Sequence, residues 1–584
     1  MRRRGPDARG IKITERAILF HTRLIVVDPE NGAQPMTQKE NGLEYTIVYN
    51  GELYNTEELR KELTAAGIEF FGHSDTEVVL KSYIHWGEKC LDRFNGIFAF
   101  AVWEEATQRL FFARDRMGVK PFFYALKNDT FIFGSEIKTL LEYPDIEPVI
   151  DRKGIIDLLF IGPGRTPGCG VFRDIHELEP GHCGTFDRNG LRTFSYWKLK
   201  DRLHTETFEE TSDHVRYLVT DAIRRQLVSD VPLGTFLSGG LDSSIISAVA
   251  ASHFRSLGHQ LDTFSVTYTD NQKYFKTSKF QPTTDEPYIQ MMAEFLGSNH
   301  HTFVVDNEQL ALALKAAVDA RDLPGMADVD SSLLLFCEEI KKHVTVALSG
   351  ECADEIFGGY PWYRDEKIRS AYGFPWAQTT AMRQKFLTTH LRKLIDGEAE
   401  VSARYEQALA ETDKSEGLSP KESRLREMVH LNMYWFMQTL LTRKDRMSMY
   451  HGLEVRVPFC DHRIAEYMYS VPWEMKEYKG MEKGLLRHAV EGLLPDEIRL
   501  RKKSPYPKTH NPQYTSIVSG MLKEITDNSD APIFDLVDRN ALTGLLNDEF
   551  TQPWYGQLMT GPQTMAYMIQ LNYWLEKYRV KISL

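Results

Sequence analysis

The sequence predicts two domains of different fold class, an α+β domain followed by an α/β domain. A chain of 584 residues is too long for a single hydrophobic core. Its first third has short apolar or alternating runs, separated by turn residues and interrupted by helical stretches, which is typical of layered α+β domains. Beyond about residue 207, helices alternate with buried apolar strands, which indicates a parallel sheet covered by helices.

Hydrophobic periodicity places the elements of the first domain, which we assign to residues 1–195. We expect helices at 56–66 and 75–86, where apolar residues recur at helical spacing. A linker at 196–206 separates this domain from the second, at 207–584. The expected strands of the first domain are 45–49, 97–103, 109–113, 122–125 and 130–134.

The second domain begins with a helix, and the apolar run 233–237 follows as a buried strand. A helix at 244–254 and a strand at 263–268 come next. A helix at 331–342 then leads to a strand at 344–348. After about residue 365 the pattern is mainly helical, so we expect a helical C-terminal part.

Composition limits the classes of function. Hydrophobic residues make up 42% and charged residues 26%, which is ordinary for a soluble globular protein. A net charge of −12 argues against nucleic acid as an obligate partner. No apolar run reaches membrane-spanning length, and Met1–Arg4 lacks the apolar segment of a signal peptide, so we expect a cytoplasmic protein. Six scattered cysteines without a Cys-x-x-Cys pair favour reduced thiols over disulfides or a zinc site.

The turn Ser238–Ser244, with the sequence SGGLDSS, joins the strand at 233–237 to the following helix. Its paired glycines allow close backbone approach, and successive N–H groups at a helix N-terminus bind anions. Serine hydroxyls add donors, and Asp242 offers a carboxylate suited to Mg²⁺. These features predict a polyphosphate loop, although an ordinary turn is the simpler alternative. A Walker loop is excluded because Gly-Lys-Ser/Thr is absent, and a lipase-type serine elbow fits poorly because Phe236 stands where that motif needs Gly.

A second motif, Ser349–Tyr360 (SGECADEIFGGY), follows another apolar strand. In a doubly wound sheet it would lie beside the first loop at the carboxyl edge. Glu351 and Asp354 are three residues apart, and we expect them on one face of a helical turn. One would complete a Mg²⁺ site with Asp242, and the other would act on a nucleophile or intermediate. The alternative is a solvated acidic helix start, which the helix dipole favours.

These motifs, with Asp445–Asp461 (DRMSMYHGLEVRVPFCD) and Met481–Arg487 (MEKGLLR), resemble the asparagine synthetase family over nearly the whole chain. The first loop resembles the pyrophosphate-binding loop of ATP pyrophosphatases, which implies a parallel-sheet domain of that type. The resemblance implies ATP-dependent synthesis of asparagine from aspartate through β-aspartyl-AMP, with release of AMP and pyrophosphate.

The resemblance also implies roles for individual residues. Glu351 would help ammonia attack the adenylate, and Lys483 would stabilise the departing pyrophosphate. Asp242 and Asp354 would support Mg²⁺. The segment 322–332 departs from better-known members, which carry threonine- and arginine-rich residues there for aspartate, so the resemblance implies adenylation more strongly than it implies the identity of the acceptor. The implied ATP and pyrophosphate contacts are Leu237, Ser238, Gly239, Gly240, Asp242, Ser243, Ser244, Val266, Ser349 and Gly350.

The first domain resembles class II glutamine amidotransferases, which are N-terminal-nucleophile hydrolases with an αββα sandwich. The resemblance rests on the segments 4–7, 21–24, 50–55, 74–77 and 114–118. It implies that Arg23 holds the glutamine carboxylate and that Glu52 and Asp75 hold its amino group. Asn50 and Gly51 would form the oxyanion hole.

The family's nucleophile is a Cys that becomes the first residue, with its own amine as base. In this sequence Met1 leads directly into the Arg-Gly-Pro-Asp segment, so the first strand and the nucleophile are missing. We therefore expect this chain to use free ammonia rather than glutamine. Three explanations are open: an incomplete start, an ammonia-dependent enzyme, or a relative that lost the glutaminase, such as a β-lactam synthetase-like ligase.

β-Lactam synthetases carry Tyr in place of Glu351, which favours the asparagine synthetase interpretation. A scaffold role gives no reason to keep Asp242, Asp354 and Lys483 together. The expected partners are small-molecule substrates, with ATP and Mg²⁺ required, no nucleic acid and no membrane. A homodimer is compatible with the sequence.

Overall fold

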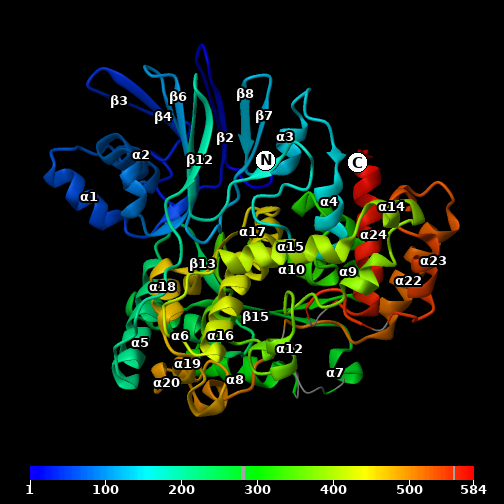
Figure 1. Cartoon of the computed structure of the whole chain (residues 1–584). Helices are drawn as coiled ribbons and strands as arrows, with labels where there is room; N and C mark the ends of the chain where they lie inside the picture. The colour runs from blue at the N-terminus through cyan, green and yellow to red at the C-terminus, as the bar shows by residue number, and fades with distance from the viewer. Residues whose placement is uncertain (276, 278–282, 505, 551, 557–558) are drawn as a thin grey trace.

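The computed structural model describes residues 1–584 except 276, 278–282, 505, 551 and 557–558. The strands of the first domain stand together above the helices of the second in Figure 1, with α1 (Thr56–Ala65) and α2 (Asp75–Trp86) on their outer side. Both helices start within a residue of their predicted positions because polar residues precede an amphipathic run. At α2, the Ser74 side chain accepts a hydrogen bond from the Glu77 N–H, which caps the helix.

A six-stranded antiparallel sheet in the order β12-β11-β6-β5-β4-β3 forms the centre of the first domain. One face packs on α1 and α2 through a core that includes Leu59, Val79 and Phe98. The strands are β3 (Met36–Glu40), β4 (Leu43–Leu53), β5 (Gly96–Glu104), β6 (Arg109–Arg114), β11 (His182–Asp187) and β12 (Gly190–Ser195).

The opposite face of this sheet packs on two smaller sheets, β1–β2 and β10-β7-β8. Leu19, Trp103 and Phe122 are buried between these strands and the large sheet. The helix α3 (Ile137–Leu141) contacts β7 and β8 on their other side. The bounds are β1 (Ala8–Ile13), β2 (Ile18–Arg23), β7 (Phe123–Lys127), β8 (Thr130–Gly134) and β10 (His176–Glu177).

The parallel sheet predicted for the second domain is present, with five strands in the order β15-β14-β13-β16-β17 and every neighbouring pair parallel. One face packs against α10 (Asp328–Lys341) and α17 (Met437–Met449). The helices α5 (Phe208–Arg225) and α6 (Leu241–Ser256) pack together beside β13. The strands are β13 (Leu233–Phe236), β14 (Asp262–Tyr268), β15 (Asn299–Val305), β16 (Val346–Leu348) and β17 (Glu454–Arg456).

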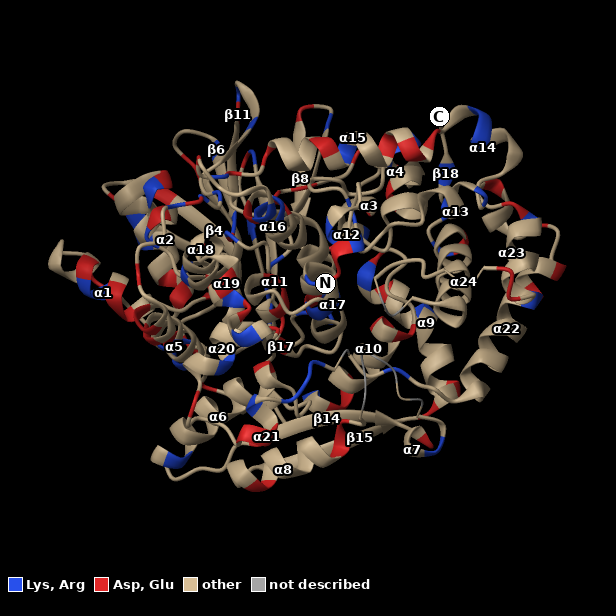
Figure 2. Ribbon diagram, turned by 60° about the horizontal axis from the view of Figure 1, so that its bottom comes forward, with Lys and Arg blue, Asp and Glu red and all other residues tan. Residues whose placement is uncertain are grey.

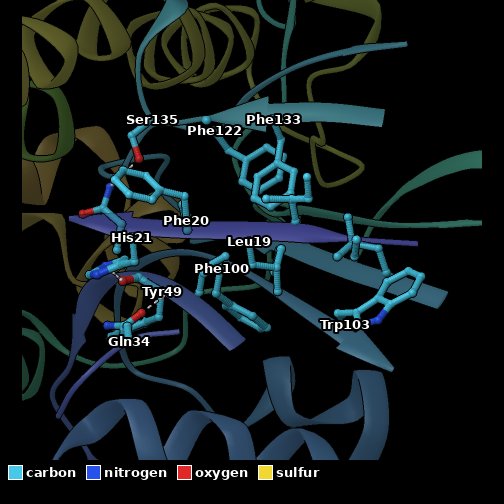
Figure 3. Close-up of a pocket in the computed structure, with 18 of the residues that line it drawn as sticks. Leu19, Phe20, His21, Gln34, Tyr49, Phe100, Trp103, Phe122, Phe133 and Ser135 are labelled. Carbon is cyan, nitrogen blue, oxygen red and sulfur yellow. Dashed lines mark hydrogen bonds between the residues drawn. The ribbon is translucent and has the colours of Figure 1, made fainter. Parts of the chain in front are cut away.

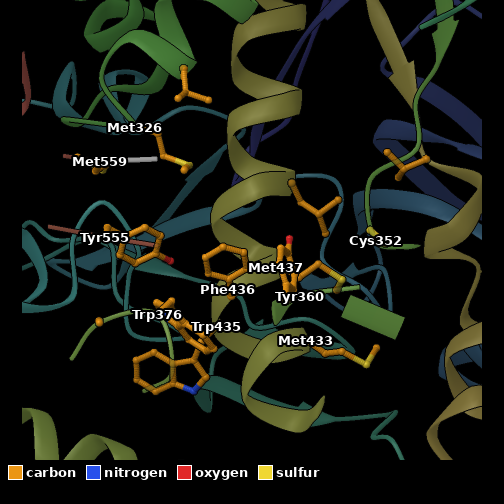
Figure 4. Packing of buried hydrophobic residues seen from close by; sticks show 14 of the residues in the cluster. Met326, Cys352, Tyr360, Trp376, Met433, Trp435, Phe436, Met437, Tyr555 and Met559 are labelled. Atoms are coloured by element: carbon orange, nitrogen blue, oxygen red, sulfur yellow. The ribbon is translucent and has the colours of Figure 1, made fainter. Parts of the chain in front are cut away.

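The C-terminal part is helical, as predicted, and its core surrounds a long helix that runs through α16 (Pro420–Leu431), the π-helical turn η4 (Asn432–Phe436) and α17. Phe436 projects among the rings of Tyr360, Trp376 and Tyr555 (Figure 4). The packing of these aromatic rings fixes the position of α17, whose residues Arg443 and Lys444 contact Glu351 in the loop after β16.

The remaining elements complete the helical layers. Near the chain end, β18 pairs in parallel with β9, so the residues around 150 of the first domain pack with the last residues of the chain. The division at 195–207 therefore stays a prediction. The remaining bounds are α4 (Arg152–Ile156), η2 (Asp157–Ile161), α7 (Asn271–Tyr274), α8 (Glu286–Leu296), α9 (Asn307–Arg321), α11 (Ala353–Phe357), α12 (Glu366–Ser370), α13 (Thr380–Gln384), α14 (Thr389–Leu394), α15 (Gly397–Ala410), α18 (His462–Ser470), α19 (Trp473–Lys476), α20 (Gly484–Ala489), α21 (Asp496–Arg499), α22 (Pro512–Asp527), α23 (Arg539–Leu546), α24 (Gly561–Lys577), β9 (Val149–Ile150) and β18 (Lys581–Ile582), with 3₁₀ turns η1 (Gly87–Asp92), η3 (Pro361–Tyr363), η5 (Pro458–Cys460), η6 (Tyr478–Gly480) and η7 (Pro532–Asp535).

Residues 196–206, the predicted linker, form neither helix nor strand but are anchored. Tyr196 donates its hydroxyl hydrogen to the Arg114 carbonyl, and the Arg202 N–H donates to the Ser470 hydroxyl. In the part of the chain that the structure describes, no helix is both long and apolar enough to cross a membrane. All six cysteines are free thiols, as the sequence predicts.

Candidate active site

The predicted phosphate loop lies between β13 and α6. Gly239 has φ +65°, and a Cβ on it would lie 2.7 Å from the Cβ of Tyr288, so the loop requires glycine there. The loop is held from within, because the Ser238 N–H donates to the Ser243 hydroxyl (3.2 Å), which in turn donates to the Gly240 carbonyl (3.2 Å). Helix α6 has no side-chain cap at its N-terminus, which leaves its first N–H groups available to an anion.

The sequence predicts a helix start at Ser244, and this is wrong by three residues. Gly240 takes an extended conformation (φ −86°, ψ 165°) and serves as the N-cap, so α6 begins at Leu241. As a result Asp242, Ser243 and Ser244 lie in the first helical turn. The Ser244 hydroxyl is buried and has no hydrogen-bond partner among the described residues.

The second motif lies directly against the first. The Ser349 N–H donates to the Arg456 carbonyl on β17 (2.9 Å), which fixes the loop after β16. A Cβ on Gly350 would lie 3.0 Å from the Cβ of Asp242, so the two turns approach each other closely at this glycine. The expected meeting of the two motifs at the carboxyl edge is present. We call the group formed by residues 238–244 and 349–354 with Lys483 the carboxyl-edge site.

Leu237 directly precedes this site, and Val266 lies on the neighbouring strand β14. Leu237 is buried and donates its N–H to the Phe264 carbonyl (2.7 Å), which ties the loop to β14. Val266 lines a cavity of about 390 Å³ whose lining includes none of the residues of the carboxyl-edge site. Its apolar walls and the polar side chains of Asp285 and Glu286 give it the mixed lining that small-molecule sites use.

Lys483 joins the two motifs. Its Nζ lies 2.5 Å from Asp242 Oδ2 and 2.5 Å from Asp354 Oδ1, and the lysine is 4% exposed. Burial raises the pKa of Asp242, whereas the charges of Lys483 and Lys503 outweigh burial at Asp354 and lower its pKa. The two carboxylates in turn raise the pKa of Lys483 against the effect of burial. The site is therefore a buried, charge-balanced cluster.

The two predicted metal ligands, Asp242 and Asp354, share one lysine, so they lie next to each other. Asp242 Oδ1 is buried and has no hydrogen-bond partner in the described part of the chain. No group of three or more His, Cys, Asp or Glu residues that could hold a metal ion occurs among the described residues. The protein can therefore supply two carboxylates, and a Mg²⁺ ion would need further oxygens from phosphate and water.

Glu351 faces a different set of cations. Lys444 Nζ lies 2.8 Å and Arg443 Nη2 3.6 Å from Glu351 Oε1, and the Ser349 hydroxyl donates to the other oxygen. Burial alone would raise the pKa of Glu351, but the charges of Lys444 and Arg443 lower it. Its carboxylate is therefore held ionised inside the site.

The expectation that Glu351 and Asp354 share one helical face is wrong. Cys352 between them has φ +78°, so α11 begins only at Ala353 and Glu351 lies in the preceding turn. The two carboxylates consequently face separate cations. This separation suits two different roles, one toward metal and phosphate and one toward the reacting carbon.

Sequence reasoning missed several basic residues of this site. Lys503 pairs with Asp354, while Arg501 donates to the Gly239 carbonyl (2.9 Å) and stacks on the Tyr288 ring at 3.9 Å. The run of basic residues at 501–503 is the sequence feature that could have drawn attention to Arg501 and Lys503. Nothing in a single sequence places this run, or Lys444 and Arg443, beside the two motifs.

A second, larger cavity of about 1630 Å³ lies in the first domain, between the large sheet and the strands β2 and β8. All five residues predicted for glutamine line it: Arg23, Asn50, Gly51, Glu52 and Asp75. Figure 3 shows its two ends, with His21, Gln34 and Tyr49 at the polar end and aromatic rings at the other. We call it the first-domain cavity. The six cysteines are not among the residues that line it.

The predicted glutamine residues are already held by the protein. Arg23 donates to the carbonyls of residues 27–29. Asp75 accepts hydrogen bonds from the Tyr49 hydroxyl (2.8 Å) and the Leu53 N–H (3.1 Å). The Asn50 amide lies 3.4 Å from the Ser135 hydroxyl. The predicted residues thus lie together at the polar end of the cavity.

Glu52 links this cavity to the parallel sheet. Arg456 Nη2 lies 3.4 Å from Glu52 Oε2, and its Nε donates to Glu454 (2.8 Å). Burial raises the pKa of Glu52, and the nearby Glu454 adds to this, while Arg456 opposes it. Since the Arg456 carbonyl also receives the Ser349 N–H, one residue contacts both sites.

Comparison with known proteins shows the family to which the chain belongs. The family model for asparagine synthase matches residues 214–576, and that for the glutamine amidotransferase domain matches residues 1–197. The chain belongs to the asparagine synthetase (glutamine-hydrolysing) family. It is an enzyme of the carbon–nitrogen ligase class.

Individual relatives support the assignment. The chain is 52% identical over 585 positions to asparagine synthetase [glutamine-hydrolyzing] 3 of Bacillus subtilis, covering 100% of this chain and 95% of that protein. It is 34% identical to asparagine synthetase [glutamine-hydrolyzing] 1 of the same organism, covering 86% of this chain and 82% of that protein. Amidase chry2 of Gibberella zeae is 28% identical, with 86% and 83% covered.

Proposed function

We propose that this enzyme makes asparagine from aspartate, ATP and a nitrogen donor through a β-aspartyl-AMP intermediate, with release of AMP and pyrophosphate. A carboxylate is a poor acceptor for ammonia because its leaving group would be oxide. Adenylation replaces that leaving group with AMP. The enzyme must therefore hold a triphosphate and stabilise pyrophosphate as it departs.

The observation that carries this proposal is the bridge that Lys483 makes between Asp242 and Asp354. It holds a buried cation beside the loop that leads into α6, and the first N–H groups of this helix have no side-chain cap and are available to phosphate. Ser238, Gly239, Gly240, Ser243 and Ser244 would cradle the phosphates, and Leu237, Val266, Ser349 and Gly350 would contact the nucleoside.

Mg²⁺ fits beside this loop. Asp242 and Asp354 would hold the ion, since Asp242 Oδ1 is a buried oxygen with no hydrogen-bond partner among the described residues. The ion would neutralise phosphate charge. Lys483 would then turn from the carboxylates toward the phosphates, where a point charge stabilises the departing pyrophosphate.

Glu351 would act on the nitrogen nucleophile. Its carboxylate is kept ionised by Lys444 and Arg443, so it can take up a proton as ammonia attacks the adenylate carbon. Its place next to Gly350, against the Asp242 turn, brings this base to the same edge as the phosphates. The bond between the β-carbon and the bridging oxygen breaks, and this oxygen, which came from the aspartate carboxylate, leaves with AMP.

For the nitrogen source, we propose that the 584-residue polypeptide uses free ammonia. None of its cysteines lines the first-domain cavity, although the predicted glutamine-binding and oxyanion residues do. This cavity would still bind glutamine at its polar end. The layered first domain is compatible with the proposed N-terminal-nucleophile hydrolase sandwich, and the parallel sheet with the pyrophosphatase type.

A β-lactam synthetase-like ligase is the alternative, because such enzymes also adenylate a carboxylate and form an amide. Glu351 with its cation pair favours the asparagine reaction, since those enzymes carry Tyr at this position. The other expectations, a homodimer and the absence of a nucleic-acid partner, stay predictions. In the view of Figure 2, acidic and basic residues both occur on helix α15.

The proposal is tested by incubating the enzyme with ATP, Mg²⁺ and aspartate, with ammonia or glutamine, and following pyrophosphate and asparagine. We expect equal amounts of both products with ammonia and none with glutamine. Pyrophosphate without asparagine from either nitrogen source would overturn the acceptor assignment. Equal rates with glutamine and ammonia would overturn the ammonia-only proposal.

A further inference from the structure

The buried guanidinium of Arg443 lacks a full set of partners. This residue lies on α17 with 5% of its side chain exposed. Within the described residues its guanidinium makes no hydrogen bond, its Nε is buried without a partner, and its nearest carboxylate oxygen, on Glu351, is 3.6 Å away. A guanidinium carries five N–H donors, and burying them unpaired is costly. A ligand that supplies acceptors would remove this cost.

Its neighbours fix this guanidinium in place. Arg443 packs over the ring of Tyr506 with 5.1 Å between the guanidinium carbon and the ring centre. The Tyr506 hydroxyl lies 3.1 Å from that of Ser332, which also accepts a hydrogen bond from the Tyr268 hydroxyl (2.8 Å). This hydrogen-bonded chain anchors the ring on which Arg443 rests. The guanidinium is therefore held in one position before a ligand binds, with its buried Nε–H unpaired.

The local charges do not balance. Glu351 faces two buried cations, and Lys444 takes the closer contact at 2.8 Å and also lies 4.2 Å from the ring centre of Phe236. One negative charge thus faces two positive charges. A second carboxylate, brought by a ligand, would complete the cluster. Arginine is suited to receive it because its fork matches both carboxylate oxygens.

The segment 322–332 cannot provide this interaction. It contains no lysine or arginine. Its acidic residues are occupied inside the fold: Asp322 pairs with Arg446, Asp330 with Arg321 at 3.3 Å, and Asp328 accepts from the Gln563 amide at 3.1 Å. A cation for the acceptor substrate must come from another element.

We propose that Arg443 determines acceptor specificity by binding the α-carboxylate of the amino-acid substrate, the one that does not react. The β-carboxylate would then point along Glu351 and Gly350 toward Asp242 and the nucleotide. Lys444 keeps Glu351 in place, which leaves the Arg443 fork to the substrate. This inference rests on the proposed function, because it takes aspartate as the acceptor.

The test compares two acceptors in wild-type enzyme and in the variants Arg443→Gln and Arg443→Lys. Aspartate carries the α-carboxylate, and 3-aminopropanoate is the same molecule without it. Pyrophosphate release gives kcat/KM for each acceptor. For aspartate we expect a loss of about 100-fold in Arg443→Gln and about 10-fold in Arg443→Lys, which keeps the charge but not the fork. For 3-aminopropanoate we expect little further loss.

Two controls separate this role from a structural one. The affinity for ATP should be unchanged in both variants. Arg392→Gln, which removes an arginine paired with Asp538 at the surface, should leave both acceptors unaffected. If Arg443→Gln does not fold, Arg443→Lys alone still reports the discrimination between the two acceptors.

An equal loss with both acceptors, or no loss with aspartate, would overturn the role of Arg443 and leave the proposed function intact. Wild-type enzyme that releases no pyrophosphate with aspartate would overturn the proposed function itself, and this inference with it.

Discussion

The carboxyl-edge site is occupied by charged side chains of the protein itself, whereas the first-domain cavity is a large space. In the first, Lys483 is 4% exposed and bridges two carboxylates at 2.5 Å, so the charges are assembled before any substrate binds. The second is a space of about 1630 Å³, well above the usual range for small-molecule sites. Its polar end is organised, and its other end is lined with rings such as Phe122 and Phe133.

This difference matters for the chemistry proposed for each region. The adenylyl transfer proposed at the carboxyl-edge site depends mainly on positioned charges, and the buried lysine and carboxylates supply them. The first-domain cavity brings together the residues proposed to bind glutamine, and none of the six cysteines lines it. Arg456 contacts both regions, through Glu52 on one side and Ser349 on the other.

The largest effect is expected at the carboxyl-edge site. Asp242→Ala should lower the rate of pyrophosphate release about 10³-fold, because it removes a carboxylate from the metal and phosphate cluster and leaves Lys483 unbalanced. Steady-state pyrophosphate release with aspartate and ammonia measures it. As a matched control, Asp538→Asn breaks an ion pair with Arg392 away from the site and should leave the rate unchanged. Full activity of Asp242→Ala would refute the phosphate-site assignment.

The contact between the two regions should matter most for stability. Arg456 is fully buried, and Arg456→Met leaves Glu52 without its cation and Glu454 with only Lys120, 3.8 Å away. Such a loss costs about 3–5 kcal/mol, which urea unfolding followed by fluorescence would detect. The triple variant with Glu52→Gln and Glu454→Gln should recover part of this loss. A change below about 1 kcal/mol in the single variant would show that the network does not stabilise the fold.

Glu355, next to Asp354, should make stability depend on pH. Burial, together with the charge of Asp354, raises its pKa to about 7, although it accepts a hydrogen bond from Tyr360. The folded state therefore holds a proton that the unfolded state releases near its ordinary pKa of 4.5. Stability should fall as pH rises from 4.5 to about 7, by up to about 3 kcal/mol, and then level off.

Glu355→Gln removes this titration. We therefore expect the unfolding free energy of the wild type to fall, relative to that of Glu355→Gln, as the pH is raised from 5 to 8. Parallel curves would contradict the raised pKa of Glu355.

The smallest expected effect is at the first-domain cavity. Glu52→Gln should weaken glutamine binding about tenfold, since it replaces the carboxyl group proposed to hold the amino group with an amide. Calorimetry gives the dissociation constant. Ammonia-dependent synthesis should be unchanged, with Glu58→Gln, a change in an exposed ion pair with Arg225, as the control. Loss of ammonia-dependent activity in Glu52→Gln would show that the two regions are not separable.

Local sequence patterns made much of the fold and of the carboxyl-edge site predictable. The parallel sheet and both loops follow from apolar runs that end in glycine- and serine-rich turns, because those signals lie within a few residues. The left-handed Cys352 was not predictable, since non-glycine residues seldom adopt positive φ. Arg443, Lys444 and Lys503 were missed because they join the site only through tertiary contacts, which a single sequence does not contain.

The central claim is that the carboxyl-edge site activates a carboxylate as its adenylate. Aspartate labelled with ¹⁸O in its β-carboxylate tests this directly, with mass spectrometry of the nucleotide product after turnover with ATP and ammonia. The account predicts one ¹⁸O atom in each AMP and none in pyrophosphate. Release of ADP with ¹⁸O in inorganic phosphate would mean an acyl phosphate instead, and would contradict it.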